Sequence, residues 1–273
     1  MALYLGSNNI KFRNEVDVPV DSPVIHELVN GTISGEYINS RLAIVGSCAF
    51  CQCSYLTAVS FPNAESIGGN AFRYCYSLTT ASFPNVEFIG ISAFANCSSL
   101  TAASFPNVTN IGSYTFYSCK SLTTASFPNA TSIGNYVFYS CTSLTTISFP
   151  NATSIGNYAF MYCSSLTTAS FPNVTRIGSY AFAYCSSLTT VSFPNVTSIG
   201  SYAFGYCYNL ISLNLIGISS VPTLSSYAFN STPIGGYSTS AGQYGSVYVP
   251  SSLYNSFQIA TNWSDIASRI ISV

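Results

Sequence analysis

A unit of 22 residues recurs through most of this chain and constrains its fold more than any other feature. A complete copy runs over residues 166–187 and reads LTTASFPNVTRIGSYAFAYCSS. The dipeptide Phe-Pro recurs with Phe at 61, 83, 105, 127, 149, 171 and 193, and Cys recurs at 53, 75, 97, 119, 141, 163, 185 and 207. A fixed period of this length is typical of a solenoid, in which each repeat packs mainly against its neighbours.

Three apolar columns within the repeat predict one short strand in every unit. The first column is Leu at 56, 78, 100, 122, 144, 166, 188 and 210; a column of Val, Ala, Ile or Leu lies three residues on, and the Phe column two further on. Residues two apart point to the same face of a strand, so the last two columns predict strands that stack in parallel. The alternate positions hold Ser, Thr and Ala, which predicts a small, hydroxylated and uncharged outer face.

The second half of the repeat predicts a second strand and a return turn. Pro follows the Phe and cannot donate to a strand ladder, so it indicates the end of the first strand. Asn comes next and suits a turn. An Ile-Gly pair then recurs at 67, 89, 111, 133, 155, 177 and 199, where we expect a short second strand. The segment x-Tyr-Ala-Phe-x-x-Cys should fold back to the next Leu as turns.

The full pattern, L-x-x-x-x-F-P-x-x-x-x-I-G-x-x-A-F-x-x-C, resembles the BspA-type leucine-rich repeats of bacterial surface proteins. The resemblance covers about residues 41–229, and the segment 249–263 is similar to tails that follow such repeats in gut Firmicutes proteins. It implies a mainly β, right-handed, curved superhelix with a parallel sheet on its concave face. For function it implies adhesion or recognition at the cell surface, or by a secreted protein.

The ends of the chain depart from the repeat and predict caps. We expect an N-terminal cap over residues 1–40, the solenoid over 41–234 and a C-terminal cap over 235–273. Ser22-Pro23 resembles the start of a helix that Asn30-Gly31 ends. The tail predicts a strand over 246–249 and a helix from 251 to about 260. A solenoid needs such caps because its end coils would otherwise expose an unpaired edge.

Composition excludes several classes of partner. Only 5% of residues are charged and the net charge is −1, so the chain has no basic stripe for a phosphate backbone, and we expect no nucleic-acid partner. No run is long and apolar enough for a membrane-spanning helix, and the first residues do not form a recognisable export signal. A protein or glycan ligand, a host-derived one included, and self-association remain open.

Few residues in the chain could carry chemistry. Eight of the ten cysteines share one inward column, where they act as small buried hydrophobes. Cys48 and Cys51 lie outside it, and no second ligand pair follows at metal spacing. His26 is the single histidine, and Glu65 and Glu87 are the only acids in the repeats. We therefore predict no catalytic, cofactor-binding or metal site, and no enzyme.

Two functional interpretations follow from the sequence. The first is a recognition module; the alternative is a structural spacer or assembly component, including a phage-like one, with no ligand of its own. Large aromatic side chains supply most binding anchors, and tyrosine is abundant in this chain. The candidate binding residues form two columns, Tyr114, Tyr136, Tyr158, Tyr180 and Tyr202, and Tyr162, Tyr184 and Tyr206. Under the alternative these tyrosines only stack on each other and shield the coil edges.

Overall fold

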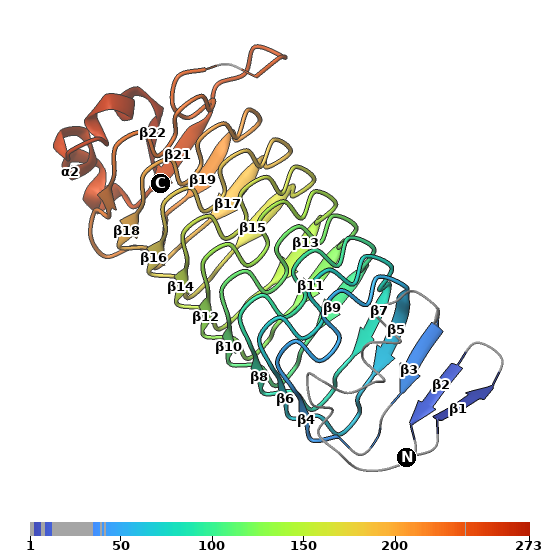
Figure 1. Cartoon of the computed structure of the whole chain (residues 1–273). Helices are drawn as coiled ribbons and strands as arrows, with labels where there is room; N and C mark the ends of the chain where they lie inside the picture. The colour runs from blue at the N-terminus through green and yellow to red at the C-terminus, as the bar shows by residue number, and fades with distance from the viewer. Residues whose placement is uncertain (1–2, 7–8, 13–34, 39, 41, 238) are drawn as a thin grey trace.

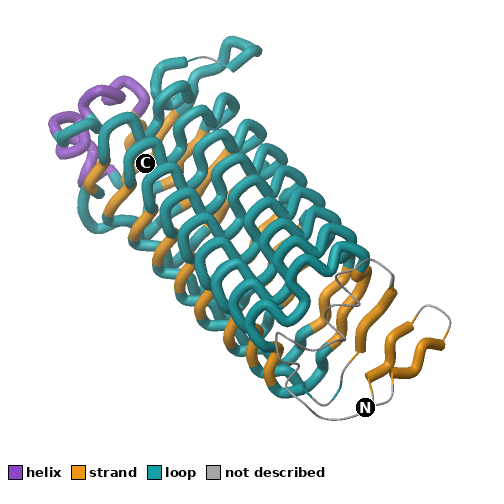
Figure 2. Tube along the Cα trace, viewed as in Figure 1, coloured by secondary structure: helices purple, strands orange, loops and turns teal. Residues whose placement is uncertain are grey.

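The structure, a computed structural model, describes residues 3–6, 9–12, 35–38, 40, 42–237 and 239–273. Within these residues the chain winds into a stack of similar coils that together form one rod (Figure 1). Each regular coil carries two short strands joined by turns, and helices occur only at the C-terminal end of the described part (Figure 2). The parallel β-solenoid predicted from the repeat is confirmed.

The first strand of every coil belongs to a main face of parallel strands. These strands are β5 (Leu56–Ser60), β7 (Thr80–Ser82), β9 (Ala102–Ser104), β11 (Thr124–Ser126), β13 (Thr146–Ser148), β15 (Thr168–Ser170), β17 (Thr190–Ser192) and β19 (Ser212–Asn214). They pair one repeat apart, so that Ala125 lies opposite Ala103 and Ile147. Equivalent side chains therefore lie side by side along the rod.

The hydrogen-bonded ladder of this face is interrupted twice, between β7 and β9 and between β13 and β15. The buried Phe rings are spaced more widely at these points, with centroids 6.0 Å apart for Phe83 and Phe105 and 6.2 Å for Phe149 and Phe171. Within an unbroken stretch, Phe127 and Phe149 are 5.3 Å apart. The coils thus separate slightly on this face at two places.

The second strands form one continuous nine-stranded parallel sheet, as the Ile-Gly pairs predicted. They are β4 (Ile44–Val45), β6 (Ser66–Ile67), β8 (Phe88–Ile89), β10 (Asn110–Ile111), β12 (Ser132–Ile133), β14 (Ser154–Ile155), β16 (Arg176–Ile177), β18 (Ser198–Ile199) and β20 (Thr223–Leu224). The Ile of every Ile-Gly pair is buried, and the Gly that follows it lies against the backbone of the preceding coil. A Cβ on Gly156 would be 2.6 Å from the carbonyl carbon of Gly134, so these coils approach too closely for any side chain.

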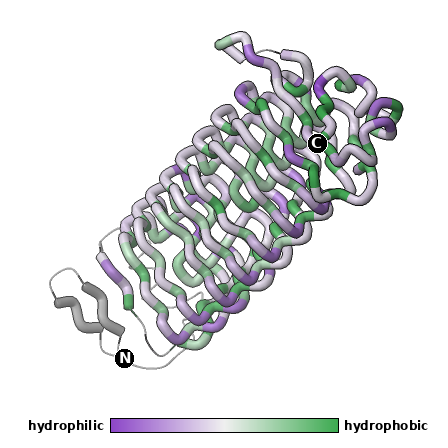
Figure 3. Tube along the Cα trace, turned by 180° about the vertical axis from the view of Figure 1, so that it is seen from behind, coloured by the Kyte–Doolittle hydropathy of each residue, from purple (hydrophilic) through white to green (hydrophobic). Residues whose placement is uncertain are grey.

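The core between the two sheets is built from stacked columns of the same residue type. Phe127 is fully buried and stacks on Phe105 with nearly parallel rings, while Phe116 and Phe138 do the same in a second Phe column. Apolar and polar residues alternate along every coil (Figure 3), because each coil places the same positions inward. Aromatic burial of this extent is a large stabilising contribution to a fold of this size.

The predicted inward cysteine column is also confirmed. All eight of its side chains are buried, and Cys119 Sγ donates a hydrogen bond to the carbonyl of Phe94 in the preceding coil at 3.1 Å. The same bond recurs in every later coil up to Cys207. Burial raises the pKa of Cys53 to about 12 and that of Cys75 well above its usual range. Cys48 and Cys51, outside the column, are only half-buried.

At the N-terminal end, three strands extend the main face beyond β5. Strands β1 (Leu3–Gly6) and β2 (Asn9–Phe12) pair antiparallel, and β3 (Gly35–Ile38) pairs in parallel with β2 and β5. The helix predicted over residues 22–30 lies outside the described residues.

At the C-terminal end, the tail covers the last coil. Its strand β21 (Ser246–Val249) pairs with β19, and β22 (Ile270–Ser272) pairs with β21. Between them lie the 3₁₀ segment η1 (Ser251–Leu253), the helix α2 (Tyr254–Ile259) and the 3₁₀ segment η2 (Ser264–Arg269). The strand and helix predicted for the tail are confirmed.

The side chains of residues 262 and 263 attach this tail to the last coil. Trp263 is fully buried, and its indole Nε1 donates to the carbonyl of Pro222 at 2.7 Å. Asn262 Nδ2 donates to the carbonyl of Leu224, in the last strand of the second sheet, at 2.6 Å. The tail thereby satisfies backbone groups that the end of a solenoid leaves without a partner.

The strand register generates a first prediction about stability. Phe127→Ala should lower the free energy of unfolding by about 3–5 kcal/mol, because it leaves a cavity in a fully buried column. Ser126→Asp, on the exposed alternate position, should change it by no more than about 0.5 kcal/mol. Urea unfolding monitored by circular dichroism measures both values. Equal losses for the two variants would contradict the register.

The cysteine column generates a second prediction. Thiol titration in denaturant, without reductant, should count close to all ten cysteines of the chain. In the folded protein Cys48 and Cys51 should react first, because a thiol reagent can reach their half-buried side chains, whereas the eight column thiols are buried. A count near zero in denaturant would mean that neighbouring coils are cross-linked by disulfides, which would contradict a ladder of free thiols.

Candidate functional site

The tyrosines singled out in the sequence occupy an unusual backbone position. All eight lie in the left-handed region, for example Tyr158 at φ 59° and Tyr162 at φ 65°, four residues apart in one turn. Asn70 and Asn96 hold equivalent positions in earlier coils with the same sign of φ. Asn is favoured in this conformation, whereas for Tyr it costs of the order of 1 kcal/mol or more. Tyrosine is therefore used here in spite of its backbone preference.

The backbone of this turn bonds to the next coil, which holds the ring positions in register. Tyr158 N–H donates to the carbonyl of Ser179 at 2.9 Å, and Tyr162 N–H donates to the carbonyl of Ala183 at 2.9 Å. These bonds repeat along the rod and form a hydrogen-bonded ladder outside the two sheets. Each Tyr is thereby placed beside its equivalent in the neighbouring coil.

The first predicted column is a continuous stack of rings. Its centroid separations are 4.7 Å for Tyr114–Tyr136, 4.6 Å for Tyr136–Tyr158, 5.0 Å for Tyr158–Tyr180 and 5.0 Å for Tyr180–Tyr202. Tyr227 extends the stack at 5.3 Å from Tyr202. Sequence reasoning missed Tyr227 because the last coil contains three extra residues, which shift it out of the 22-residue period.

The second predicted column is also stacked and is longer than expected. Tyr162 and Tyr184 are 4.7 Å apart, and Tyr184 and Tyr206 are 4.4 Å apart. Tyr139 meets Tyr162 edge-on at 5.4 Å and stacks on Tyr117 at 4.9 Å. Tyr117 and Tyr139 come one residue earlier in their repeats, so a search at fixed period does not group them with this column.

The two columns join into one surface, which we call the tyrosine ridge. Tyr136 and Tyr139 connect them at 5.8 Å, and Tyr202 and Tyr206 at 6.5 Å. The ridge consists of Tyr114, Tyr117, Tyr136, Tyr139, Tyr158, Tyr162, Tyr180, Tyr184, Tyr202, Tyr206 and Tyr227. The predicted stacking of the tyrosines on each other is therefore observed.

The ridge presents neutral phenols to solvent. Most of its rings are half-buried, while Tyr114 is 38% and Tyr227 64% exposed. Desolvation is the main cause that raises the pKa of Tyr136, and the neighbouring Tyr158 raises it further. For Tyr184, desolvation again has the largest effect on the pKa, and the neighbouring Tyr206 adds to it. A raised pKa keeps these hydroxyls protonated at neutral pH, so that they can both donate and accept hydrogen bonds.

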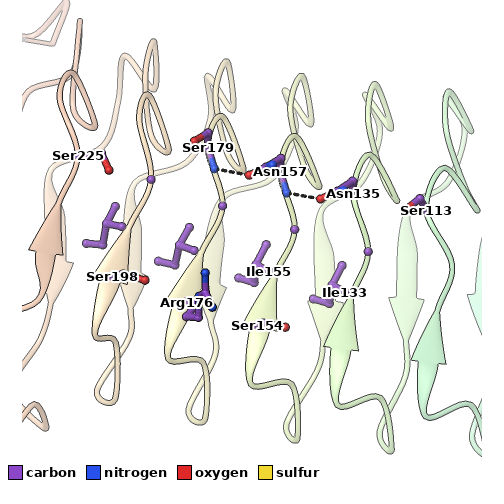
Figure 4. Close-up of a pocket in the computed structure, with 16 residues that line it drawn as sticks. Ser113, Ile133, Asn135, Ser154, Ile155, Asn157, Arg176, Ser179, Ser198 and Ser225 are labelled. Carbon is purple, nitrogen blue, oxygen red and sulfur yellow. Dashed lines mark hydrogen bonds between the residues drawn. The ribbon is translucent and has the colours of Figure 1, made fainter.

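A polar groove of about 560 Å³ runs along the second sheet (Figure 4). Ser154, Arg176 and Ser198 lie along one side of it, on neighbouring strands. The other side carries Asn135, Asn157 and Ser179, each directly before a ridge tyrosine of the first column. In these three coils, a residue that lines the groove is therefore followed directly along the chain by a tyrosine of the ridge. The sequence offered no direct signal for it, because its walls are mostly Ser, Gly and Asn at turn and strand positions.

Other candidate sites find little support in the described part of the chain. No group of three or more His, Cys, Asp or Glu residues there could hold a metal ion. His26 falls outside the described residues. No described helix has both the length and the apolar character needed to cross a membrane.

Comparison with known proteins identifies the repeat. A family model described as the BspA type leucine rich repeat region, present in six copies, matches residues 32–145 and 109–235. No match was found among curated protein sequences.

Solved structures share the fold at low sequence identity. A leucine-rich cell surface protein of Faecalibacterium prausnitzii is 20% identical with a TM-score of 0.53, over 92% of this chain and 89% of that protein. A leucine-rich repeat protein of Bacteroides ovatus is 19% identical with a TM-score of 0.51, over 90% and 79% of the two chains. Together with the match to six repeat copies, the stacked coils show that this chain belongs to the BspA-type leucine-rich repeat family.

Proposed function

We propose that this protein is a non-enzymatic recognition module that binds a protein or glycan at a bacterial surface. The observation that carries the proposal is the tyrosine ridge, a continuous aromatic surface that extends over six coils. Leucine-rich repeats of this type occur in bacterial surface proteins, and the F. prausnitzii neighbour is described as a cell surface protein. Adhesion is the function that fits a protein at the bacterial surface, and a host molecule is one of the candidate ligands.

The ridge has the properties of a binding surface. Tyr is enriched among residues that dominate binding energy, because it provides a large contact area with few rotatable bonds. Stacking fixes each ring before a ligand arrives, so less conformational entropy is lost on binding. The phenol hydroxyls can exchange hydrogen bonds with a sugar or a peptide. The main face, in contrast, offers Ser, Thr and Ala without a large anchor.

The alternative is a structural spacer or assembly component without a ligand. One observation favours it: ring centroids 4.4–5.0 Å apart already give Tyr184, Tyr206 and their equivalents close aromatic partners within the chain. Stacking of this kind stabilises neighbouring coils whether or not a partner binds. The two functions differ in whether any ligand contacts the ridge.

A binding screen with paired variants separates them. The protein is tested on immobilised extracellular-matrix proteins and on a glycan array. Tyr158→Asn with Tyr180→Asn should weaken binding of any ligand found by at least about tenfold, since two anchors are lost. Asn is chosen because Asn70 holds the same left-handed turn position, so the fold should persist.

The matched control places two tyrosines on the main face, as Thr146→Tyr with Thr168→Tyr. This variant should bind as the unmodified protein does. Loss of binding in the control but not in the ridge variant would place the site on the main face. A screen without any ligand would support the spacer function instead.

A further inference from the structure

We propose that the groove along the second sheet binds an acidic polysaccharide, with the guanidinium of Arg176 holding the carboxylate of a uronic acid. This inference rests on the proposed recognition function and gives it a ligand class and a second contact surface beside the tyrosine ridge.

The first step is the charge in the groove. Arg176 is exposed in the middle strand of the lining, with Ser154 and Ser198 as its register partners in the neighbouring strands. The carboxylates of the described repeats, Glu65 and Glu87, belong to coils near the other end of the sheet. Arg176 therefore lies in a groove without a neighbouring acid among its lining residues. A guanidinium binds a carboxylate through two parallel N–H bonds, so an anionic ligand complements this position.

Arg176 also differs from the other described arginines in its surroundings. Arg73 donates to Tyr74 and Asn70 and lies over the Tyr74 ring, 4.7 Å from its centroid. Arg269 lies 4.1 Å from the centroid of the Tyr244 ring. These two side chains contribute to local structure. Within the described residues, Arg176 makes neither a side-chain hydrogen bond nor a contact with an aromatic ring, so its N–H donors are available to a ligand.

The second step is the opposite wall, where asparagine amides are held in a fixed orientation. Asn135 Oδ1 accepts a hydrogen bond from the backbone N–H of Asn157 at 2.8 Å, and Asn157 Oδ1 accepts one from Ser179 at 2.8 Å (Figure 4). The acceptor side of each amide is thus occupied, which leaves the Nδ2 donors of two exposed side chains for a ligand. Donors fixed in this way suit the hydroxyl and ring oxygens of a sugar chain.

The third step distinguishes a glycan from an acidic peptide. The Ile-Gly pairs along the groove have their Ile side chains buried in the core, and its other lining residues are Ser, Asn and Arg, so it has no apolar pocket for peptide side chains. Strands β12, β14, β16 and β18 are each paired on both sides, so no edge is open for an added peptide strand. Hydroxyl and amide groups recur once per coil, about every 4.8 Å, which suits a ligand that also repeats.

The test measures binding of oligogalacturonate, a chain of uronic acids, by isothermal titration calorimetry. Neutral dextran and polyglutamate are run in parallel at the same salt concentration, since charge attraction depends on ionic strength. Arg176→Ser is the test variant, because Ser already occupies the equivalent positions 154 and 198 and should preserve the fold. Lys120→Ser, an exposed cation on a turn outside the groove, is the matched control.

Oligogalacturonate should bind, Arg176→Ser should weaken it at least tenfold, and Lys120→Ser should change it less than twofold. Absence of oligogalacturonate binding, or an equal loss in both variants, would overturn the inference. Polyglutamate that binds as tightly, with the same dependence on Arg176, would also overturn it and indicate a peptide ligand. If other ligands still bind and depend on Tyr158 and Tyr180, only this inference fails and the recognition function stands.

Discussion

The structure depends on the close approach of successive coils along the second sheet. There the Ile-Gly pair of one coil lies directly against that of the coil before, and the glycine leaves room for backbone contact where a Cβ would not fit. This approach lets nine short strands form one unbroken ladder, although each strand contains only two residues. Isolated strands of that length would not be stable, so the stack as a whole, and not any single coil, carries the stability.

The surfaces follow from the same constraint. Because every coil repeats the path of the last, a residue at one position meets its equivalent 22 residues on, or 25 residues on in the last coil. Columns of Phe, Cys and Tyr result. Inward columns provide the core, and outward ones make the tyrosine ridge and the walls of the groove. A single substitution at one position, such as Arg176 among serines, then changes the chemistry of one point on a regular surface.

Much of the fold could be predicted from the sequence, since the period alone indicates which residues share a column. The burial of Phe127, the second strands and the inward cysteines all follow from it. The interruptions of the main face could not be predicted, because the repeats on either side of each interruption have the same pattern. The ridge was predicted in part. Tyr117 and Tyr139 were missed because they lie one residue earlier in the repeat than the column they join, and Tyr227 because three extra residues in the last coil shift it out of the period.

The most direct test of this account compares two glycines at the same position of the repeat. A Cβ at Gly156 would meet backbone atoms of the preceding coil at 2.6–2.7 Å, whereas one at Gly46, in the first coil, would meet nothing within 4 Å in the described structure. We expect urea unfolding to show that Gly156→Ala loses about 1–3 kcal/mol of stability, as overpacking does. Gly46→Ala should be neutral or gain up to about 1 kcal/mol, because alanine restricts the unfolded chain. Equal stability of the two variants would contradict the claim that close approach of the coils holds this fold together.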